Sequence, residues 1–281
     1  MRQLPQLVIE PLVRAALLED LGRAGDLTTD AIIDPDATAE VALVSRDPGV
    51  VAGLACAELA WRLVDSRITM VTEIPDGSRV APGSVIARVG GPARGLLTGE
   101  RVALNFLGHL SGVATGTATI ADAIAHTRAR VADTRKTIPG LRSLQKYAVA
   151  AGGGSNHRFG LDDAVLIKDN HIAVAGSVTE AVTRVRRTVG HLVKVEVEVD
   201  GLDQLRELLA IGADAVLLDN MTPDLLAEAV RLIDRRMITE ASGRITPLTA
   251  VPIAEAGVDL ISVGWLTHSA RVLDIGLDHV H

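Results

Sequence analysis

The chain has 281 residues, of which 48% are apolar and 22% are charged, and its formal net charge is −7. This size and balance suit a globular protein with one large domain and a smaller one. Aromatic residues make up only 2% of the chain, so side chains that could stack on bases are nearly absent. Together with the acidic charge, this argues against a nucleic-acid partner.

The single cysteine, Cys56, excludes an intrachain disulfide and a zinc site built from cysteines. Its alanine and leucine neighbours predict a buried thiol. The first eleven residues lack a basic region followed by an apolar stretch, so no secretory signal is expected and a cytoplasmic location is predicted.

The first hundred residues predict a small module of helices and antiparallel strands. Apolar residues recur at helical spacing over 6–21, alternate as in a strand over 38–51, and predict a helix over 53–64. Residues 68–89 then predict short strands, because Pro75-Asp76-Gly77 and Ala81-Pro82-Gly83 are turn sequences.

A long helix over 96–125 and a strand–helix alternation up to Gly264 follow, which predicts an α/β barrel-like domain. The uncharged stretch 102–121 is long enough to cross a membrane. It carries Asn105, His109 and several threonines and glycines, so a buried helix is expected and no membrane contact. The tail from Leu266 is too short for another unit and is expected to return to the N-terminal module.

Polar groups follow the apolar runs of this second region at intervals of roughly 20–30 residues, about one strand–helix unit each. The runs end at Asp133-Thr134-Arg135-Lys136, Lys168-Asp169-Asn170, Glu196-Val197-Glu198, Asp219-Asn220 and Gly264, with a short segment Ile238–Gly243 before the last. In a barrel of parallel strands these endings share one rim, where binding and catalysis occur.

Cationic residues gather between positions 135 and 171. They are Arg135, Lys136, Arg142, Lys146, His157, Arg158, Lys168 and His171. Arg142 and Lys146 are expected on a solvated surface. Five of the others flank a Gly152–Asn156 loop or follow apolar runs: Arg135, Lys136, His157, Arg158 and Lys168. So many donors predict a pocket for a small ligand with several negative groups. For His157, a structural role and a binding role remain open alternatives.

Three carboxylates, Glu196, Glu198 and Asp200, alternate along one strand and are expected to share a face. Asp219 ends the next strand and can join Glu198 across the rim. Such oxygen ligands suit Mg²⁺ or sugar hydroxyls. The alternative is an ion-pair network with Lys168 and Lys194.

Glycines at two late strand ends, in Ser242-Gly243 and Val263-Gly264, predict a seat for a phosphate group. The triple glycine 152–154 matches neither the phosphate loop nor the dinucleotide fingerprint and is expected to form a flexible turn.

On these residues the chain resembles the quinolinate phosphoribosyltransferase family over nearly its whole length. The matching blocks are Glu19-Asp20-Leu21-Gly22, Gly25-Asp26-Leu27-Thr28-Thr29, Gly99-Glu100-Arg101-Val102-Ala103-Leu104-Asn105-Phe106, Asp133–Arg142, Gly153–Arg158, Ile167–His171, Glu196–Val199, Leu218–Met221, Glu240–Gly243, Ser262-Val263-Gly264 and Leu266–Ser269. Trp265 departs from the pattern, because a small residue is expected there.

The resemblance implies an N-terminal α/β sandwich domain, residues 1–98 joined by the tail 267–281, and an incomplete α/β barrel, residues 99–266. It implies transfer of phosphoribose from phosphoribosyl pyrophosphate to quinolinate, with decarboxylation to nicotinate mononucleotide in NAD synthesis. It also implies Mg²⁺ and a homodimer or larger homo-oligomer in which Arg101 reaches the partner's site.

The residue roles that the resemblance implies fall into three groups. Quinolinate is bound by Arg101, Thr134, Arg135, Lys136, His157, Arg158 and Lys168. Phosphoribosyl pyrophosphate is bound by Lys136, Lys168, Glu198, Asp219, Ser242, Gly243, Arg244, Val263, Gly264 and Trp265. Lys136, Glu198 and Asp219 are the expected catalytic residues, and Glu198 and Asp219 the expected Mg²⁺ ligands.

Two rival interpretations remain at this point. One is a related enzyme for another pyridine or pyrimidine carboxylate, such as the phosphoribosyltransferase-like protein associated with molybdenum transport. The other is a non-catalytic anion-binding or assembly protein that keeps the barrel. The pairing of Arg135 and Arg158 with His157 favours a dicarboxylate, and Glu198 and Asp219 disfavour a simple phosphate binder.

Overall fold

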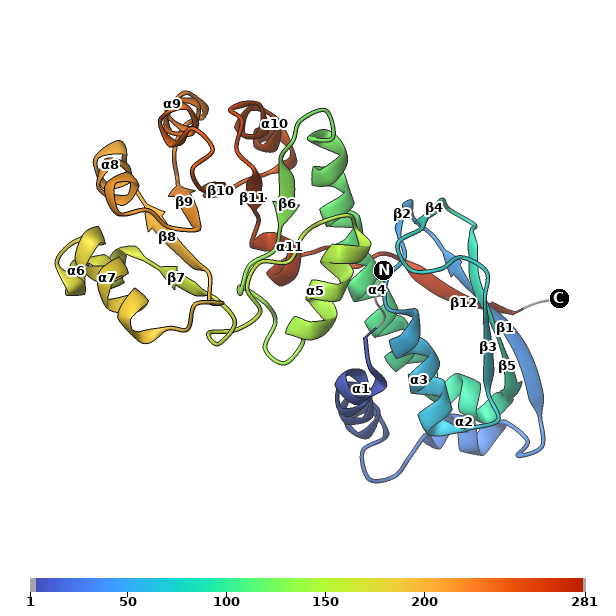
Figure 1. Ribbon diagram of the computed structural model, residues 1–281. Coiled ribbons are helices and arrows are strands. Elements are labelled where there is room, and N and C mark those ends of the chain that lie inside the picture. The colour runs from blue at the N-terminus through green and yellow to red at the C-terminus, as the bar shows by residue number, and fades with distance from the viewer. Residues whose placement is uncertain (1–3, 280–281) are drawn as a thin grey trace. The chain divides into compact units, whose positions relative to one another are not determined.

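The computed structural model describes residues 4–279, which form two compact units (Figure 1). The first unit contains the chain up to Ala118, the segment Thr137–Gly153 and the chain from Leu266 onward. The second contains Thr119–Lys136 and Gly154–Trp265.

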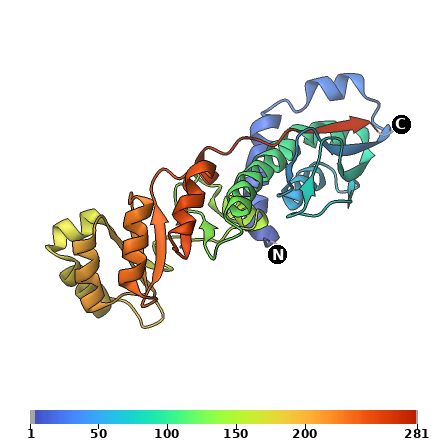
Figure 2. The same cartoon turned by 90° about the horizontal axis from the view of Figure 1, so that it is seen from above.

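The first unit combines helices with a small antiparallel sheet. Its helices are α1 (Gln6–Leu21), α2 (Leu27–Ile32), α3 (Leu54–Val64), α5 (Arg142–Ala151) and most of the continuous helix α4 (Ala93–Ala123), which is seen well in Figure 2. Its strands are β1 (Thr38–Ser45), β2 (Gly49–Val50), β3 (Thr69–Thr72), β4 (Arg79–Val80), β5 (Val85–Pro92) and β12 (Ile275–His279). Four of them form an antiparallel sheet in the order β12-β1-β5-β3, and β2 pairs with β4.

Trp61 fixes the packing of α3 against α4 in this unit. Its ring is fully buried, and its Nε1–H donates to the carbonyl of Leu96 over 2.9 Å. Gly99 allows the close approach, because a Cβ at that position would lie 2.6 Å from the indole ring. A buried indole ring removes a large apolar area from water, and Trp61 does so at the contact between α3 and α4.

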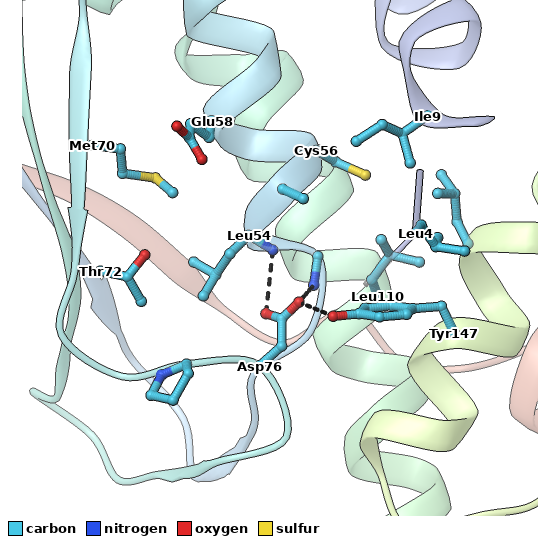
Figure 3. A pocket seen from close by; sticks show the side chains of 14 residues that line it. Leu4, Ile9, Leu54, Cys56, Glu58, Met70, Thr72, Asp76, Leu110 and Tyr147 are labelled. Atoms are coloured by element: carbon cyan, nitrogen blue, oxygen red, sulfur yellow. Dashed lines mark hydrogen bonds between the residues drawn. The ribbon is translucent and has the colours of Figure 1, made fainter. Parts of the chain in front are cut away.

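A cavity of about 500 Å³ lies beside the N-terminus of α3 (Figure 3). At its base the Asp76 carboxylate accepts hydrogen bonds from the backbone N–H groups of Gly53 and Leu54, and from the Tyr147 hydroxyl at 2.7 Å. The carboxylate thus caps the helix, where unpaired N–H groups and the helix dipole favour a negative charge. Cys56 lines the same cavity, and burial raises the pKa of its thiol to about 12, so the prediction of a buried, unreactive cysteine is confirmed.

The second unit repeats a strand followed by a helix. Its strands are β6 (Arg130–Ala132), β7 (Val165–Ile167), β8 (Val195–Val199), β9 (Ala215–Asp219), β10 (Ile238–Ser242) and β11 (Leu260–Ser262). Its helices are α6 (Asp169–Ala175), α7 (Val178–Thr188), α8 (Leu202–Ile211), α9 (Pro223–Ile233) and α10 (Pro247–Glu255), and α11 (Trp265–His268) begins at its last residue. Ser177, Thr222 and Thr246 cap α7, α9 and α10 through their hydroxyls, which explains where these helices begin.

All six strands of this unit are parallel, in the order β6-β11-β10-β9-β8-β7, and helices α7 to α10 lie outside them (Figure 1). This is the order of a barrel in which β6 and β7 would close the ring. Within residues 4–279 no ladder joins β6 to β7, so the barrel is open. The predicted fold class, an incomplete α/β barrel with a separate antiparallel module, is confirmed.

Several predicted elements of the first unit are also confirmed, among them α1, α3 and the return of the tail, whose strand β12 pairs with β1. The single strand predicted over 38–51 is wrong in one respect. It is two strands, because the turn after Ser45 contains Pro48, which has no N–H to donate to a ladder.

The expected domain bounds, 1–98 joined by the tail 267–281 and 99–266, stay a prediction; the compact units place α5 and most of α4 in the first unit. Leu144 and Val149 of α5 are fully buried in the core that also contains Trp61, and much of α4 belongs to the same core. The uncharged stretch 102–121 lies within α4, as expected for a buried helix. In the part of the chain that is described, no helix is long and apolar enough to cross a membrane.

Candidate active site

A cavity of about 390 Å³ lies at the carboxyl ends of the parallel strands of the second unit. Its walls come from the ends of β6 to β11 and from the loop after Ser155. They are formed by Thr134, Arg135, Lys136, His157, Arg158, Leu166, Lys168, Glu198, Leu217, Asp219, Glu240, Ser242 and Ser262. The strand ends that the sequence places on one rim thus surround one pocket of a size that suits small ligands.

Asp133 brings the two cationic segments of the pocket together. Its carboxylate, which is fully buried, accepts hydrogen bonds from the Asn156 side chain at 2.6 Å and from the backbone N–H of His157 at 2.9 Å. A bridge between Ala132 and Ser155 ties the same loop to β6. Arg135, just past β6, and Arg158 therefore line the same cavity although 23 positions separate them in the chain.

The two arginines carry buried donors with no acceptor. The Nε–H groups of both Arg135 and Arg158 are inaccessible to solvent and have no hydrogen-bond partner. Arg158 donates through Nη1 to the carbonyl of Ala164 at 3.1 Å, and its pKa is lowered by burial first and by Arg135 next. A buried N–H donor without an acceptor lowers the stability of the folded protein, and the cost is larger when the donor belongs to a charged group that a second cation repels. The site therefore favours an anionic ligand that accepts hydrogen bonds from both guanidinium groups.

Across the pocket, Lys168 and Glu198 form an ion pair at 3.4 Å. Burial raises the pKa of Glu198, an effect that the positive charge of Lys168 opposes and the nearby Asp219 reinforces. Half of the Lys168 side chain remains exposed, so its ammonium can face a ligand as well as Glu198. Both members of the pair line the cavity that the two arginines also line.

Asp219 is held at the end of β9 by hydroxyl and amide donors. Its Oδ1 accepts from the Ser242 hydroxyl at 2.6 Å, and its Oδ2 accepts from the Asn220 side chain at 2.5 Å. Gly243 permits this packing, because its φ is +117° and a Cβ there would lie 2.4 Å from the Asn220 amide oxygen. Glu198 and Asp219 thus offer only oxygen ligands, a donor set that fits Mg²⁺.

Other residues expected at the late strand ends lie beside the pocket. Val263 is buried, and Arg244, an exposed residue, has a φ of +47° next to Gly243. The Trp265 ring, which departs from the family pattern, donates its Nε1–H to the carbonyl of Ile245 at 2.8 Å. It therefore anchors the loop that follows Gly243 to the end of β11.

Some expectations about charged residues are wrong. Lys146 is 1% exposed and therefore does not lie on a solvated surface; it is one of the buried residues of α5. Of the three carboxylates expected to share a face, only Glu198 lines the pocket, and Asp200 lies beyond the end of β8 at Val199. In the alternative ion-pair network, Lys168 does pair with Glu198, but Lys194 pairs with Asp214 at 2.5 Å.

Arg101 lies on α4 in the first unit, outside the cavity described above. Its side chain is exposed and lines a surface hollow with Asp20, Asp26 and Thr98. Its proposed role toward quinolinate stays a prediction.

The pocket also contains two residues that had no assigned role, Glu240 and Ser262. Glu240 is 2% exposed, and burial first and the charge of Glu196 next raise its pKa to about 7. The one available signal in the sequence was a single carboxylate inside the otherwise uncharged strand β10. Charged residues are almost never fully buried unless paired, so its position marks it as part of the site.

The raised pKa of Glu240 predicts a pH dependence of stability. Between pH 4.5, the usual pKa of a glutamate, and about pH 7, Glu240 keeps its proton in the folded protein and loses it in the unfolded chain. The stabilisation by this proton is complete below pH 4.5 and is lost as the pH rises to about 7. Glu240→Gln is expected to be the more stable protein at pH 8, by on the order of 3 kcal/mol, and to lose less stability from pH 5 to pH 8. Calorimetry at both pH values measures this. An equal loss in variant and parent would contradict it.

Comparison with known proteins places this site in a family. The family model described as "Quinolinate phosphoribosyl transferase, N-terminal domain" matches residues 26–111, and the model for the C-terminal domain matches residues 113–278. The chain is 43% identical over 272 residues to the probable nicotinate-nucleotide pyrophosphorylase [carboxylating] of Bacillus subtilis (strain 168), covering 97% of this chain and 93% of that protein.

Two further relatives also match over nearly the whole chain. The nicotinate-nucleotide pyrophosphorylase [carboxylating] of Mycobacterium leprae (strain TN) is 45% identical over 274 residues, 95% of either chain. The crystal structure of NadC from Streptococcus pyogenes superposes with a TM-score of 0.95 at 41% identity, over 100% of both chains. The resemblance drawn from the sequence is confirmed, and the chain belongs to the quinolinate phosphoribosyl transferase family.

Proposed function

We propose that this protein transfers phosphoribose from phosphoribosyl pyrophosphate to quinolinate and releases pyrophosphate and CO₂, giving nicotinate mononucleotide for NAD synthesis. The observation that carries the proposal is that Arg135 and Arg158, whose Nε–H donors have no partner in the protein, line the same cavity as Glu198 and Asp219. The two arginines suit a dianion such as quinolinate, and the two carboxylates suit a ribose ring that becomes positive as pyrophosphate leaves. The names of the family and of its relatives support the same reaction.

Quinolinate presents two carboxylates on adjacent ring carbons, one of which is bonded to the ring nitrogen. Guanidinium groups bind carboxylates through paired hydrogen bonds, and an ammonium binds them as a point charge. We assign the two carboxylates to Arg135, Arg158 and Lys168, with Thr134 and His157 lining the same wall. Binding both carboxylates would fix the direction of the ring nitrogen, which is the nucleophile.

Phosphoribosyl pyrophosphate is assigned to the opposite side. Glu198 and Asp219 would hold the ribose hydroxyls, and Lys136 and Lys168 would lie between the two substrates. The 5′-phosphate would occupy the loops after β10 and β11, which contain Ser242, Gly243, Arg244, Val263, Gly264 and Trp265. Backbone N–H groups in glycine-containing loops are suited to phosphate oxygens.

Mg²⁺ fits the donor set of Glu198 and Asp219, together with oxygens of the substrate. When bound, the ion would supply charge neutralisation for the pyrophosphate.

The proposed reaction begins as the bond between the anomeric carbon and pyrophosphate breaks, with the electron pair leaving on pyrophosphate. Glu198 and Asp219 stabilise the positive charge that develops on the ribose. The quinolinate nitrogen, held by the arginines, forms the new bond, and this orientation removes part of the entropic barrier. The carboxylate next to the nitrogen then leaves as CO₂; its electron pair stays on the ring carbon, beside the cationic nitrogen, and takes a proton from water.

Calorimetric titration with quinolinate, nicotinate and orotate tests the proposed specificity. Quinolinate is expected to bind at least about 100-fold more tightly than nicotinate, because nicotinate leaves buried cationic donors unpaired. Tighter binding of orotate would favour the related enzyme for another ring carboxylate. Binding of inorganic phosphate without any binding of quinolinate, with or without phosphoribosyl pyrophosphate, would favour the non-catalytic anion-binding protein.

We further propose a homodimer or larger homo-oligomer in which Arg101 completes the site of a neighbouring subunit. Arg101→Ala and Lys136→Ala proteins are each expected to be nearly inactive. If each site takes Lys136 from its own subunit and Arg101 from its partner, mixing them after reversible dissociation restores about a quarter of the sites. Turnover assays of the mixture measure this recovery.

The matched control replaces Arg62, an exposed arginine on α3, by alanine. That variant should keep full activity alone and in mixtures. Capture of mixed oligomers through a tag on one variant verifies that subunits have exchanged. A mixture that stays inactive after verified exchange would contradict the shared site.

A further inference from the structure

His157 is the centre of a polar network beneath the arginine side of the pocket. Its Nδ1 accepts a hydrogen bond from the backbone N–H of Arg158 at 2.7 Å. Its Nε2 lies 2.9 Å from Glu196 Oε2 and 3.6 Å from Glu240 Oε1. Both ring nitrogens therefore face protein groups, and the imidazole is mostly buried, with 13% of its side chain exposed.

The two contacts of the ring fix its tautomer. A nitrogen that accepts a hydrogen bond from a backbone N–H carries no proton, so Nδ1 is bare and Nε2 carries the hydrogen that Glu196 accepts. An imidazolium would place two N–H groups against each other at Nδ1. The contacts of His157 are thus those of a neutral ring.

This tautomer also decides against a metal ion at the same place. His157, Glu196 and Glu240 offer ligand atoms within 4.8 Å of one another. A metal ligand must be an unprotonated nitrogen, and here Nε2 is the protonated one. Arg135 and Arg158, both lining the adjacent cavity, add a repulsion that a cation would have to overcome.

Glu196 and Glu240 compete for the single N–H of the ring. Glu196 takes it at the shorter distance, whereas Glu240 Oε1 is buried and has no hydrogen-bond partner. Two carboxylates this close do not both ionise readily when buried. Glu240, at 2% exposure, is the one deeper in the protein. The other groups that face this network are Asp133 from β6, the two arginines, and the Ser262 hydroxyl from β11.

We propose that His157 is a neutral positioning residue, held between the Glu196 carboxylate that accepts its Nε2–H and the backbone N–H of Arg158, and that the buried Glu240 beside it is protonated. The inference rests on the proposed function and deepens it, since it removes His157 from the cations that pair with the substrate. With Glu240 protonated, Arg135 and Arg158 keep positive charge that is not neutralised from below. That charge is then available to the two carboxylates of quinolinate.

Kinetic variants test the positioning role. Glu196→Ala is expected to raise the KM for quinolinate about tenfold while the KM for phosphoribosyl pyrophosphate stays unchanged, because it frees the ring that supports Arg158. Glu196→Gln, whose amide oxygen can still accept the Nε2–H, should restore most of the loss. Glu240→Gln replaces a neutral carboxyl with a neutral amide, so it should raise the KM for quinolinate less than Glu196→Ala does. Asp200→Asn, an exposed neighbour of β8, is the matched control.

Equal changes in both KM values for Glu196→Ala, or a loss of about 100-fold for a well-folded Glu240→Gln, would overturn the proposal. The first result would indicate a merely structural role, and the second would show that the charge of Glu240 is needed.

The protonation of His157 can be measured without any turnover. Nitrogen NMR of protein labelled at histidine, with the signal assigned by comparison with His157→Asn, should show one protonated ring nitrogen from pH 6 to pH 8. Two protonated nitrogens at pH 7, or stoichiometric Zn²⁺ binding that Glu240→Gln abolishes, would overturn the proposal. Because this readout needs no substrate, a failure of the proposed reaction would leave it interpretable.

Discussion

Alanine in place of Arg135 or Arg158 is expected to lower kcat/KM for quinolinate by about 100-fold or more, since removing one partner of a buried, hydrogen-bonded charge pair costs several kcal/mol. Each variant removes a guanidinium whose Nε–H has no partner within the protein. The KM for phosphoribosyl pyrophosphate should change little, because that substrate is assigned to the other side of the cavity. Steady-state kinetics with each substrate varied in turn measure both effects.

The fold should survive these changes. Burial and Arg135 together lower the pKa of Arg158, which means that each guanidinium is destabilised by the other in the free protein. Removing one of them should therefore leave the melting temperature unchanged or raise it. Arg187→Ala, on the exposed side of α7, is the matched control and should leave both KM values unaltered. A parallel loss of affinity for both substrates would contradict the assignment of the arginines to quinolinate.

Glu198→Gln and Asp219→Asn are expected to lower kcat by about 10²–10³-fold with little change in quinolinate binding, the size seen when one group that stabilises transition-state charge is removed. Both substitutions keep the shape of the side chain and remove its charge. Asp219→Asn also keeps an oxygen that can accept from Ser242, so the strand end should stay in place. The loss would therefore report charge and not folding.

Single-turnover measurements separate this effect from binding and product release. Glu228→Gln, an exposed carboxylate on α9, is the control and should keep the parent rate. Variants at Glu198 and Asp219 that keep the parent kcat and differ only in KM would show that the carboxylates bind substrate without stabilising developing charge. That result would remove them from the catalytic residues.

Much of the second unit could be predicted from the sequence because its signal is local and repeated. Short apolar strands alternate with capped amphipathic helices, and a parallel barrel puts every strand end on one rim. Lys168 after β7, Glu198 in β8 and Asp219 at the end of β9 therefore meet in one cavity, as strand order alone suggests. Their roles toward the substrates stay predictions.

The parts that the sequence could not indicate depend on contacts between distant segments. The lone carboxylate of β10 was the one sequence signal at Glu240, and it did not show that the side chain is buried. Lys146 has the same helical spacing that a surface lysine would have. Both are placed by packing from other elements. Likewise, α5 belongs to the core of the first unit although it follows β6 of the barrel, because Leu144 and Val149 bury their side chains there.

His157 shows the difference between locating a residue and assigning its role. Position beside Arg158 in a cationic loop suggested a binding residue or a structural one. The hydrogen bond from the Arg158 backbone and the contact with Glu196 define which ring nitrogen carries the proton. Such a tautomer follows from three-dimensional contacts and from nothing in the order of residues.

The most direct test of the account follows CO₂ released from quinolinate labelled at the carboxylate next to the ring nitrogen. With phosphoribosyl pyrophosphate and Mg²⁺ present, labelled CO₂ and pyrophosphate should appear in equal amounts, and omission of phosphoribosyl pyrophosphate should abolish both. Release of CO₂ without phosphoribosyl pyrophosphate, or pyrophosphate formed from nicotinate as readily as from quinolinate, would contradict a pocket built around a pyridine dicarboxylate.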